Sequence, residues 1–139
     1  MYKHILVAVD GSENSQRVAN EALRLAHLSK NSIIELVYVI DESDLGSVAF
    51  RSPESLKNDP VIQQRLYPIE SLFEQEGIPY VLTKLQGSPG KAITEYAKEK
   101  KADLIMIGSR GLNPIEKLVI GSVSQKVVNH SPCAVLVVK

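Results

Sequence analysis

The chain has 139 residues, of which 44% are hydrophobic and 23% are charged. This length and balance predict a single globular domain over residues 1–139, and they exclude a disordered or fibrous chain. Sixteen Lys and Arg residues balance sixteen Asp and Glu residues, so the chain has no net positive field to attract nucleic acid or anionic lipid.

The apolar runs along the chain are short. The longest ones, Ile5–Val9 and Ala134–Val138, are far too short to cross a bilayer, and residues 1–4 lack the apolar stretch of a secretion signal. We therefore expect a cytoplasmic protein with no membrane partner. Cys133 is the single cysteine, which excludes an intramolecular disulfide.

The first half of the chain is predicted to alternate strands and helices. Ile5–Val9 is an uninterrupted apolar run that ends at Asp10, as expected of a strand covered on both faces. A helix follows over Asn14–Ser29, because its apolar residues form one stripe at helical spacing. Ile33–Ile40 is the next predicted strand.

A loop and a third pair of elements complete this half. Asp41–Asp59 is rich in Ser, Asp and Gly and is predicted to be a long surface loop. Apolar residues then repeat at helical spacing from Ile62 to Phe73, and Gly77 stops this helix. Pro68 lacks a backbone donor, so it either kinks the helix or marks its true start.

The second half repeats the same alternation. Pro79–Gln86 is a predicted strand, and Ser88 is expected to cap a helix that runs to about Lys100. The remaining predicted elements are a strand over Asp103–Ile107, two helical pieces within Asn113–Asn129, and a strand over Ala134–Val138. Strands separated by helices predict an α/β fold with a parallel sheet, right-handed connections and helices on both faces.

Ligands of open parallel sheets bind beyond the carboxyl ends of the strands. At one such end the chain places Gly108 and Gly111, which permit positive φ and a close approach of phosphate to backbone amides. Further on, Gly121 precedes Ser122, the expected N-cap of a helix, with Gln125 completing a capping box. The convergence favours a phosphate cradle of backbone amides, although glycines that only form turns are the alternative.

Other residues near the strand ends leave alternatives open. Asp10 suits an adenine amino group, a ribose hydroxyl or nucleotide-bound Mg²⁺, and it equally suits a turn before a helix. Val39 and Ile40 can form an apolar wall for a base. Arg110 can pair with a phosphate or be solvated. The chain has neither a Walker A lysine nor a Gly-x-Gly-x-x-Gly fingerprint after its first strand.

These residues resemble the universal stress protein family, in its ATP-binding branch, over essentially the whole chain. Gly108-x-x-Gly111, nine residues and then Gly121-Ser122 match the family signature Gly-x2-Gly-x9-Gly-Ser/Thr. Three further segments lie where the family places similar sequence, namely Ile5–Ser12, Val37–Ile40 and Ser131–Val138.

The resemblance implies strand order 3-2-1-4-5, which brings Asp10 beside Gly108. It further implies a homodimer paired through the edge strand Val135–Val138, and bound ATP with Mg²⁺. In this interpretation Asp10 and Val39 contact adenine and ribose, and the backbone or hydroxyl groups that hold ribose and phosphates belong to Gly108, Gly111, Gly121, Ser122, Val123 and Ser124.

Three functions are compatible with these features. The first is a nucleotide-dependent signalling protein of the stress response that acts on a protein partner of unknown identity, with binding rather than catalysis as its activity. The second is a slow ATPase or an autokinase that uses Ser109, Ser122 or Ser124 as acceptor or Asp10 to orient water. The third is a dimerisation module without nucleotide, in which the glycines are structural.

Overall fold

The computed structural model describes residues 2–41, 58–110 and 120–139. Strands and helices alternate along these ranges, as predicted. In chain order the elements are β1 (His4–Ala8), α1 (Glu13–Leu28), β2 (Ile33–Ile40), α4 (Pro60–Glu76), β3 (Val81–Gln86), α5 (Pro89–Lys100), β4 (Leu104–Gly108), α6 (Ser122–His130) and β5 (Ala134–Val138).

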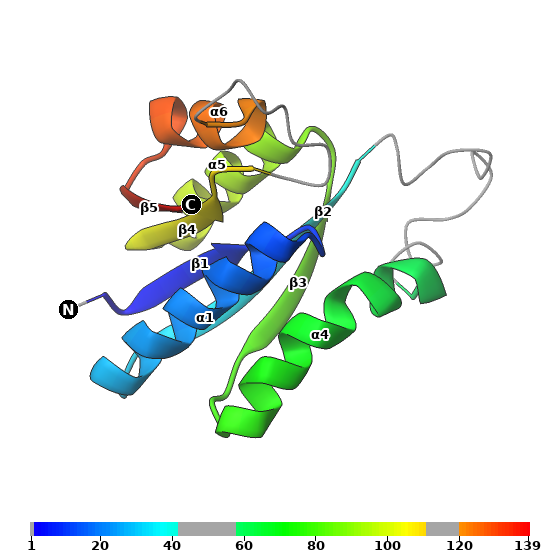
Figure 1. Ribbon diagram of the computed structural model, residues 1–139. Coiled ribbons are helices and arrows are strands. Elements are labelled where there is room, and N and C mark those ends of the chain that lie inside the picture. Colours follow the sequence, from blue (N-terminus) through cyan, green and yellow to red (C-terminus); the bar gives the residue numbers. More distant parts are fainter. Residues whose placement is uncertain (1, 42–57, 111–119) are drawn as a thin grey trace.

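The strands form one parallel sheet in the order β3-β2-β1-β4-β5. This confirms both the α/β class and the strand order that the family resemblance implied. Figure 1 shows α1 and α4 together on one side of the sheet and α5 and α6 on the other. The chain winds outwards from β1 in both directions, so the winding reverses between β1 and β4.

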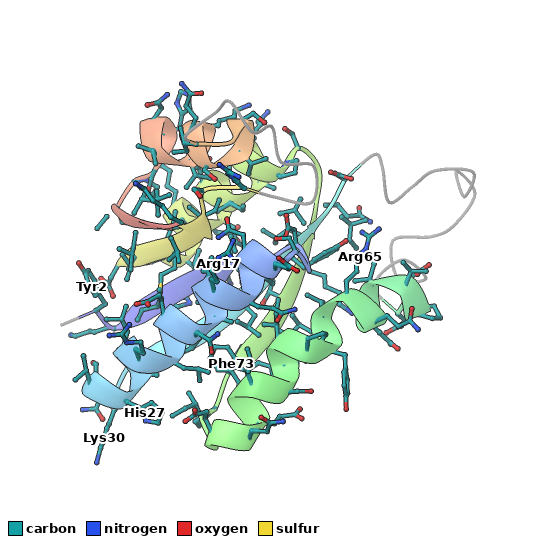
Figure 2. The ribbon with its side chains drawn as sticks, viewed as in Figure 1. Tyr2, Arg17, His27, Lys30, Arg65 and Phe73 are labelled. Atoms are coloured by element: carbon teal, nitrogen blue, oxygen red, sulfur yellow. The ribbon has the colours of Figure 1, made fainter. Side chains whose placement is uncertain are left out.

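Each face of the sheet has its own apolar core. Ile5 and Val7 of β1 pack with α1 and α4 on one face, whereas Leu6 and Ala8 pack with α5 and α6 on the other. On α4, Phe73 is fully buried and points towards the sheet (Figure 2). Burial on both faces explains why the β1 sequence is continuously apolar rather than alternating.

Local capping residues set the ends of α4. The Asp59 side chain accepts a hydrogen bond from Val61 N at 2.8 Å, and Pro60 occupies the first turn. Gly77 ends the helix with φ of 67°, as predicted for a left-handed C-cap. The helix begins eight residues before Pro68 and continues through it, so the alternative that Pro68 marks its start is wrong.

Strand β4 begins at Leu104, one residue later than predicted, and the preceding residue, Asp103, contacts the start of β1. Its carboxylate accepts hydrogen bonds from Lys3 N and His4 N, both at 2.8 Å, and these bonds hold the Asp103 pKa below its ordinary value. Asp103 therefore fastens the amino end of β1 beside β4.

Parts of two predictions lie outside the described residues. They are most of the Asp41–Asp59 loop and the first helical piece of Asn113–Asn129. Within the described ranges, no helix combines the length and the apolar character needed to cross a membrane.

Candidate ligand site at the strand ends

The carboxyl ends of β2, β1 and β4 meet at the point where the winding reverses. Ala8 of β1 is paired with Val37 of β2, and Val7 is paired with Met106 of β4. Continuing both registers past the ends of β1 brings Asp10 level with Val39 on one side and Ser109 on the other. The predicted approach of the Asp10 turn to the Gly108 loop follows from this topology.

Asp10 forms a hydrogen-bonded turn with the first residues of α1. Its Oδ1 accepts from Ser12 N at 2.9 Å and from Ser15 Oγ at 2.6 Å, and its backbone N donates to Ser15 Oγ at 2.8 Å. The turn interpretation therefore accounts for Oδ1. Both of the hydrogen bonds that described residues donate to this carboxylate reach Oδ1, and none of them reaches Oδ2.

The structure separates the two residues predicted to form an apolar wall. Ile40 is buried in the core beneath α1 and α4, with 1% of its surface exposed. Val39 is only partly buried and packs with Leu85 on the opposite face. Of the two, Val39 is the residue with apolar surface left for a base.

Gly108 does not have the positive φ that the sequence suggested, because the described glycines with positive φ are Gly11, Gly77 and Gly87. Its lack of a side chain has a different cause. A Cβ at Gly108 would lie 2.3 Å from Oδ1 of Asn14. Asn14 in the first turn of α1 is 4% exposed, and no pattern in the sequence marked it as part of the site.

Backbone amides in the predicted phosphate cradle already have protein acceptors. Ser109 N donates to Val138 O at 2.8 Å, Arg110 N to Asn14 Oδ1 at 2.7 Å, and Gly121 N to Ser109 O at 2.6 Å. These three amides therefore hold the loop together rather than face a ligand. Gly111 lies outside the described residues.

The amino end of α6 has a different cap from the one predicted. Gly121, not Ser122, is the N-cap, since Gln125 N donates to Gly121 O at 2.9 Å and Ser122 is the first helical residue. The prediction of a Ser122–Gln125 capping box is thus wrong. Gly121 has no side chain to accept a hydrogen bond, and the described residues provide no other acceptor for the amides of Ser122, Val123 and Ser124.

The side chains around this helix end differ in exposure. Ser122 is exposed, whereas Ser124 is buried and its hydroxyl donates to Gly108 O. Val123 packs partly against the core beneath α5 and α6. Arg110 is exposed on the loop, where the structure leaves its role open.

Helix α4 contacts the Asp10 turn from the other side. A Cβ at Gly11, whose φ is 87°, would lie 2.8 Å from Cβ of Arg65. Arg65 extends from α4 towards β2, where its Nη1 donates to Tyr38 Oη at 2.8 Å (Figure 2). Gly11 is thus a glycine for reasons of conformation and of packing.

A buried polar cluster lies near the amino end of the sheet, away from the strand exits. Glu35 of β2 accepts hydrogen bonds from Thr83 and Tyr96, and its Oε1 is 2.8 Å from His4 Nε2. Burial by itself raises the pKa of the Glu35 carboxyl. The hydrogen bonds from Thr83, Tyr96 and His4 outweigh burial and hold that pKa below its ordinary value.

A doubly wound parallel sheet with an uncapped helix end at its reversal point defines a class of α/β domains that accept ligands beyond their strand ends. The model of the universal stress protein family matches residues 1–139. The chain belongs to that family.

Relatives and solved structures agree with this assignment. The universal stress protein MJ0531 of Methanocaldococcus jannaschii is 34% identical over 145 residues, which cover 100% of this chain and 83% of that protein. The solved structure of the hypothetical protein MJ0577 has a TM-score of 0.82 and 28% identity, covering 100% of this chain and 96% of its own. A universal stress protein solved in complex with cAMP has a TM-score of 0.73 and 26% identity, covering 99% and 98% of the two chains.

Proposed function

We propose that this protein is an ATP-binding regulatory protein of the stress response, in which residues 1–139 act as one domain and nucleotide binding is the activity. The observation that carries the proposal is the uncapped amino end of α6 beside the Asp10 turn. The cAMP complex of a related protein supports the nucleotide class. ATP in particular is inferred from the resemblance to the ATP-binding branch of the family, which rests on the glycine motif.

The phosphate groups are assigned to the loop after β4 and to the start of α6. Three backbone amides and the positive end of the helix dipole favour an anion there. Gly121 supports this role, because a Cβ at this position would lie 3.2 Å from Ser109 O and would narrow the space through which a phosphate reaches the α6 amides. The Ser122 hydroxyl is exposed and can donate to a phosphate oxygen. Gly111 and Arg110 complete the proposed phosphate site.

The nucleoside is assigned to the β1 and β2 side. Asp10 Oδ2 can accept a hydrogen bond from an adenine amino group or a ribose hydroxyl, and Val39 offers apolar surface to the base. Carboxylate oxygens also suit Mg²⁺, so a nucleotide-bound Mg²⁺ at this oxygen, in place of the nucleoside, is the alternative role of Asp10. When bound, ATP supplies the negative charge that the α6 end lacks.

Binding is favoured over catalysis by the state of the serine hydroxyls. The Ser124 hydroxyl donates to Gly108 O, and Ser109 is 5% exposed. Of the three serines considered as phosphate acceptors, Ser122 alone is exposed. A slow ATPase or autokinase therefore remains the second candidate, with Ser122 as its accessible acceptor.

We test the phosphate assignment by capping α6. Gly121 has φ of −73° and ψ of 166°, which any residue can adopt. Gly121→Asp places a carboxylate that accepts from the α6 amides, so it should stabilise the helix by roughly 0.5 kcal/mol. The same carboxylate should repel phosphate and weaken ATP binding by at least about tenfold.

Isothermal titration with Mg²⁺-ATP measures this effect, and Gly121→Ala is the matched control. Both variants introduce the same Cβ near Ser109 O, but only aspartate caps the helix. Equal ATP affinity in the two variants would show that the phosphate site lies elsewhere. No binding of ATP to the unaltered protein, together with no nucleotide in the purified sample, would refute the proposed function.

We also propose a homodimer that pairs through Val135–Val138 of β5. This strand ends the sheet, and Leu136 on it is 39% exposed. The other edge strand, β3, carries Lys84, a residue type that discourages edge pairing, whereas β5 has no charge within its five residues. We further propose that the dimer is cytoplasmic. A protein partner there would bind differently to the nucleotide-bound and the nucleotide-free protein.

A further inference from the structure

Asn14 occupies a central place in the site. From the first turn of α1 its Oδ1 accepts from Arg110 N at 2.7 Å, and its Nδ2 donates to Val138 O at 3.1 Å. The side chain thus joins the loop after β4 to the carboxyl end of β5. At 4% exposure, the amide is held among protein groups rather than presented to solvent.

The Asn14 amide also lies directly on Gly108. A Cβ on Gly108 would lie 2.3 Å from Oδ1 and 2.7 Å from Cγ of Asn14. Contacts this short are not tolerated between real atoms. The next neighbour, Arg110 O at 3.2 Å, would need to move by only a few tenths of an ångström.

We infer that Asn14 is a positioning residue of the ligand site, and that Gly108 is a glycine in order to accommodate Asn14 rather than a ligand. The backbone of Gly108 is not in the left-handed region, so conformation does not require glycine. The packing of Asn14 against this position is what requires glycine. The inference rests on the proposed function only for the measurement of ATP affinity; the measurement of stability does not depend on it.

A double-mutant cycle on stability tests the contact without any ligand. Gly108→Ala forces Asn14 out of place and should lower the midpoint of thermal unfolding by about 10 °C. Asn14→Ala removes two hydrogen bonds but creates space, and should lower the midpoint by about 5 °C. In Asn14→Ala/Gly108→Ala the clash is absent, so the midpoint should match that of Asn14→Ala alone.

Two control pairs test whether the loss of stability in Gly108→Ala is caused by lack of space beside Asn14. Asn14→Asp has the size and shape of asparagine, so Gly108→Ala should remain damaging beside it, although Asn14→Asp alone should lose stability because a carboxylate oxygen replaces the donor to Val138 O. Arg17→Ala alters an exposed residue of the same helix (Figure 2) and should not rescue Gly108→Ala either. Losses that add in the Asn14→Ala double variant would overturn the inference, as would a double variant that fails to fold. If Gly108→Ala alone fails to fold and the double variant folds, the inference is supported.

The second arm measures Mg²⁺-ATP affinity in the same four proteins. Gly108→Ala should weaken binding about tenfold, whereas Asn14→Ala alone should weaken it about threefold, because the loop after β4 loses the Oδ1 acceptor of Arg110 N. The double variant should bind as Asn14→Ala does, and unchanged affinity in Asn14→Ala would show that Asn14 does not position the site. If glycine were needed for the ligand, Gly108→Ala would weaken binding equally with and without Asn14. No ATP binding by the unaltered protein would refute the proposed function, and the stability cycle would still decide the role of Asn14.

Discussion

The substitution Asp10→Asn separates the two roles of the Asp10 carboxylate. Oδ1 belongs to the turn, where it accepts from Ser12 N and Ser15 Oγ. Oδ2 is the oxygen assigned to the nucleotide. Asparagine keeps one acceptor oxygen, which the two donors of the turn will retain, and it presents an NH₂ group where Oδ2 was.

The magnitudes follow from these contacts. The turn keeps both hydrogen bonds but loses their charge assistance, so stability should fall by only about 1 kcal/mol. The ligand loses a charged hydrogen bond and meets a donor instead of an acceptor, which should cost about 2–3 kcal/mol, or roughly a 30- to 150-fold loss of affinity. Binding is therefore expected to suffer far more than folding.

Ser15→Ala is the reciprocal control. Ser15 is 4% exposed and its Oγ bonds both Asp10 Oδ1 and Asp10 N. Its removal should lower stability by about 2 kcal/mol and leave Oδ2 in place. Urea denaturation and titration with Mg²⁺-ATP on both variants give the comparison. If Asp10→Asn binds ATP as well as the unaltered protein does, the carboxylate is a turn residue only and the nucleoside assignment is wrong.

Three further predictions concern stability and assembly. Glu35→Gln should cost about 2–4 kcal/mol at pH 7, since it disrupts three hydrogen bonds to a buried carboxylate. The folded-state Glu35 pKa is lowered, so this contribution is present above the unfolded Glu pKa of about 4.3 and is lost as the pH falls through the folded value. A difference in urea unfolding that does not decrease as the pH is lowered would contradict this. Leu136→Lys should convert a dimer to a monomer in sedimentation equilibrium, and an unchanged mass would place the interface elsewhere. Gly77→Ala should cost about 1 kcal/mol, because φ is 67° but nothing lies within 4 Å of the new Cβ; a much larger loss of thermal stability would reveal a contact at this turn.

The fold was predictable because the strong signals in this sequence are local. Continuous apolar runs such as Ile5–Val9 mark strands buried on both faces, and Gly77 marks a helix end by its own backbone limits. Strand order is not local, and it came from the family resemblance. The contact between the Asp103 side chain and the start of β1 could not be predicted either, because the residues it joins lie 99 and 100 positions apart in the sequence.

The sequence could predict which segments meet at the candidate site, but not the contacts between their side chains. Topology alone brings the Asp10 turn to the loop after Gly108. The sequence could not reveal that Asn14 contacts Gly108, because the two residues lie far apart in the chain and are joined only by folding. Likewise the capping box at Ser122 failed by one residue. Glycine and serine are both common N-cap residues, so the sequence Gly121-Ser122 does not show which of the two is the cap. The structure decides, because the backbone of Gly121 is extended and Ser122 is helical.

The two helix ends beside the reversal point differ in a way that would orient the proposed nucleotide. At α1, Ser12 Oγ accepts from Ser15 N and the Asp10 carboxylate accepts from Ser12 N, so this end already has its cap and a negative charge. A phosphate there would meet repulsion. At α6, Gly121 has no side chain to cap the helix, and the first turn of the helix carries no acidic residue. Because Asp10 repels phosphate and α6 attracts it, the proposed nucleotide lies with its nucleoside towards β1 and β2 and its phosphates towards α6.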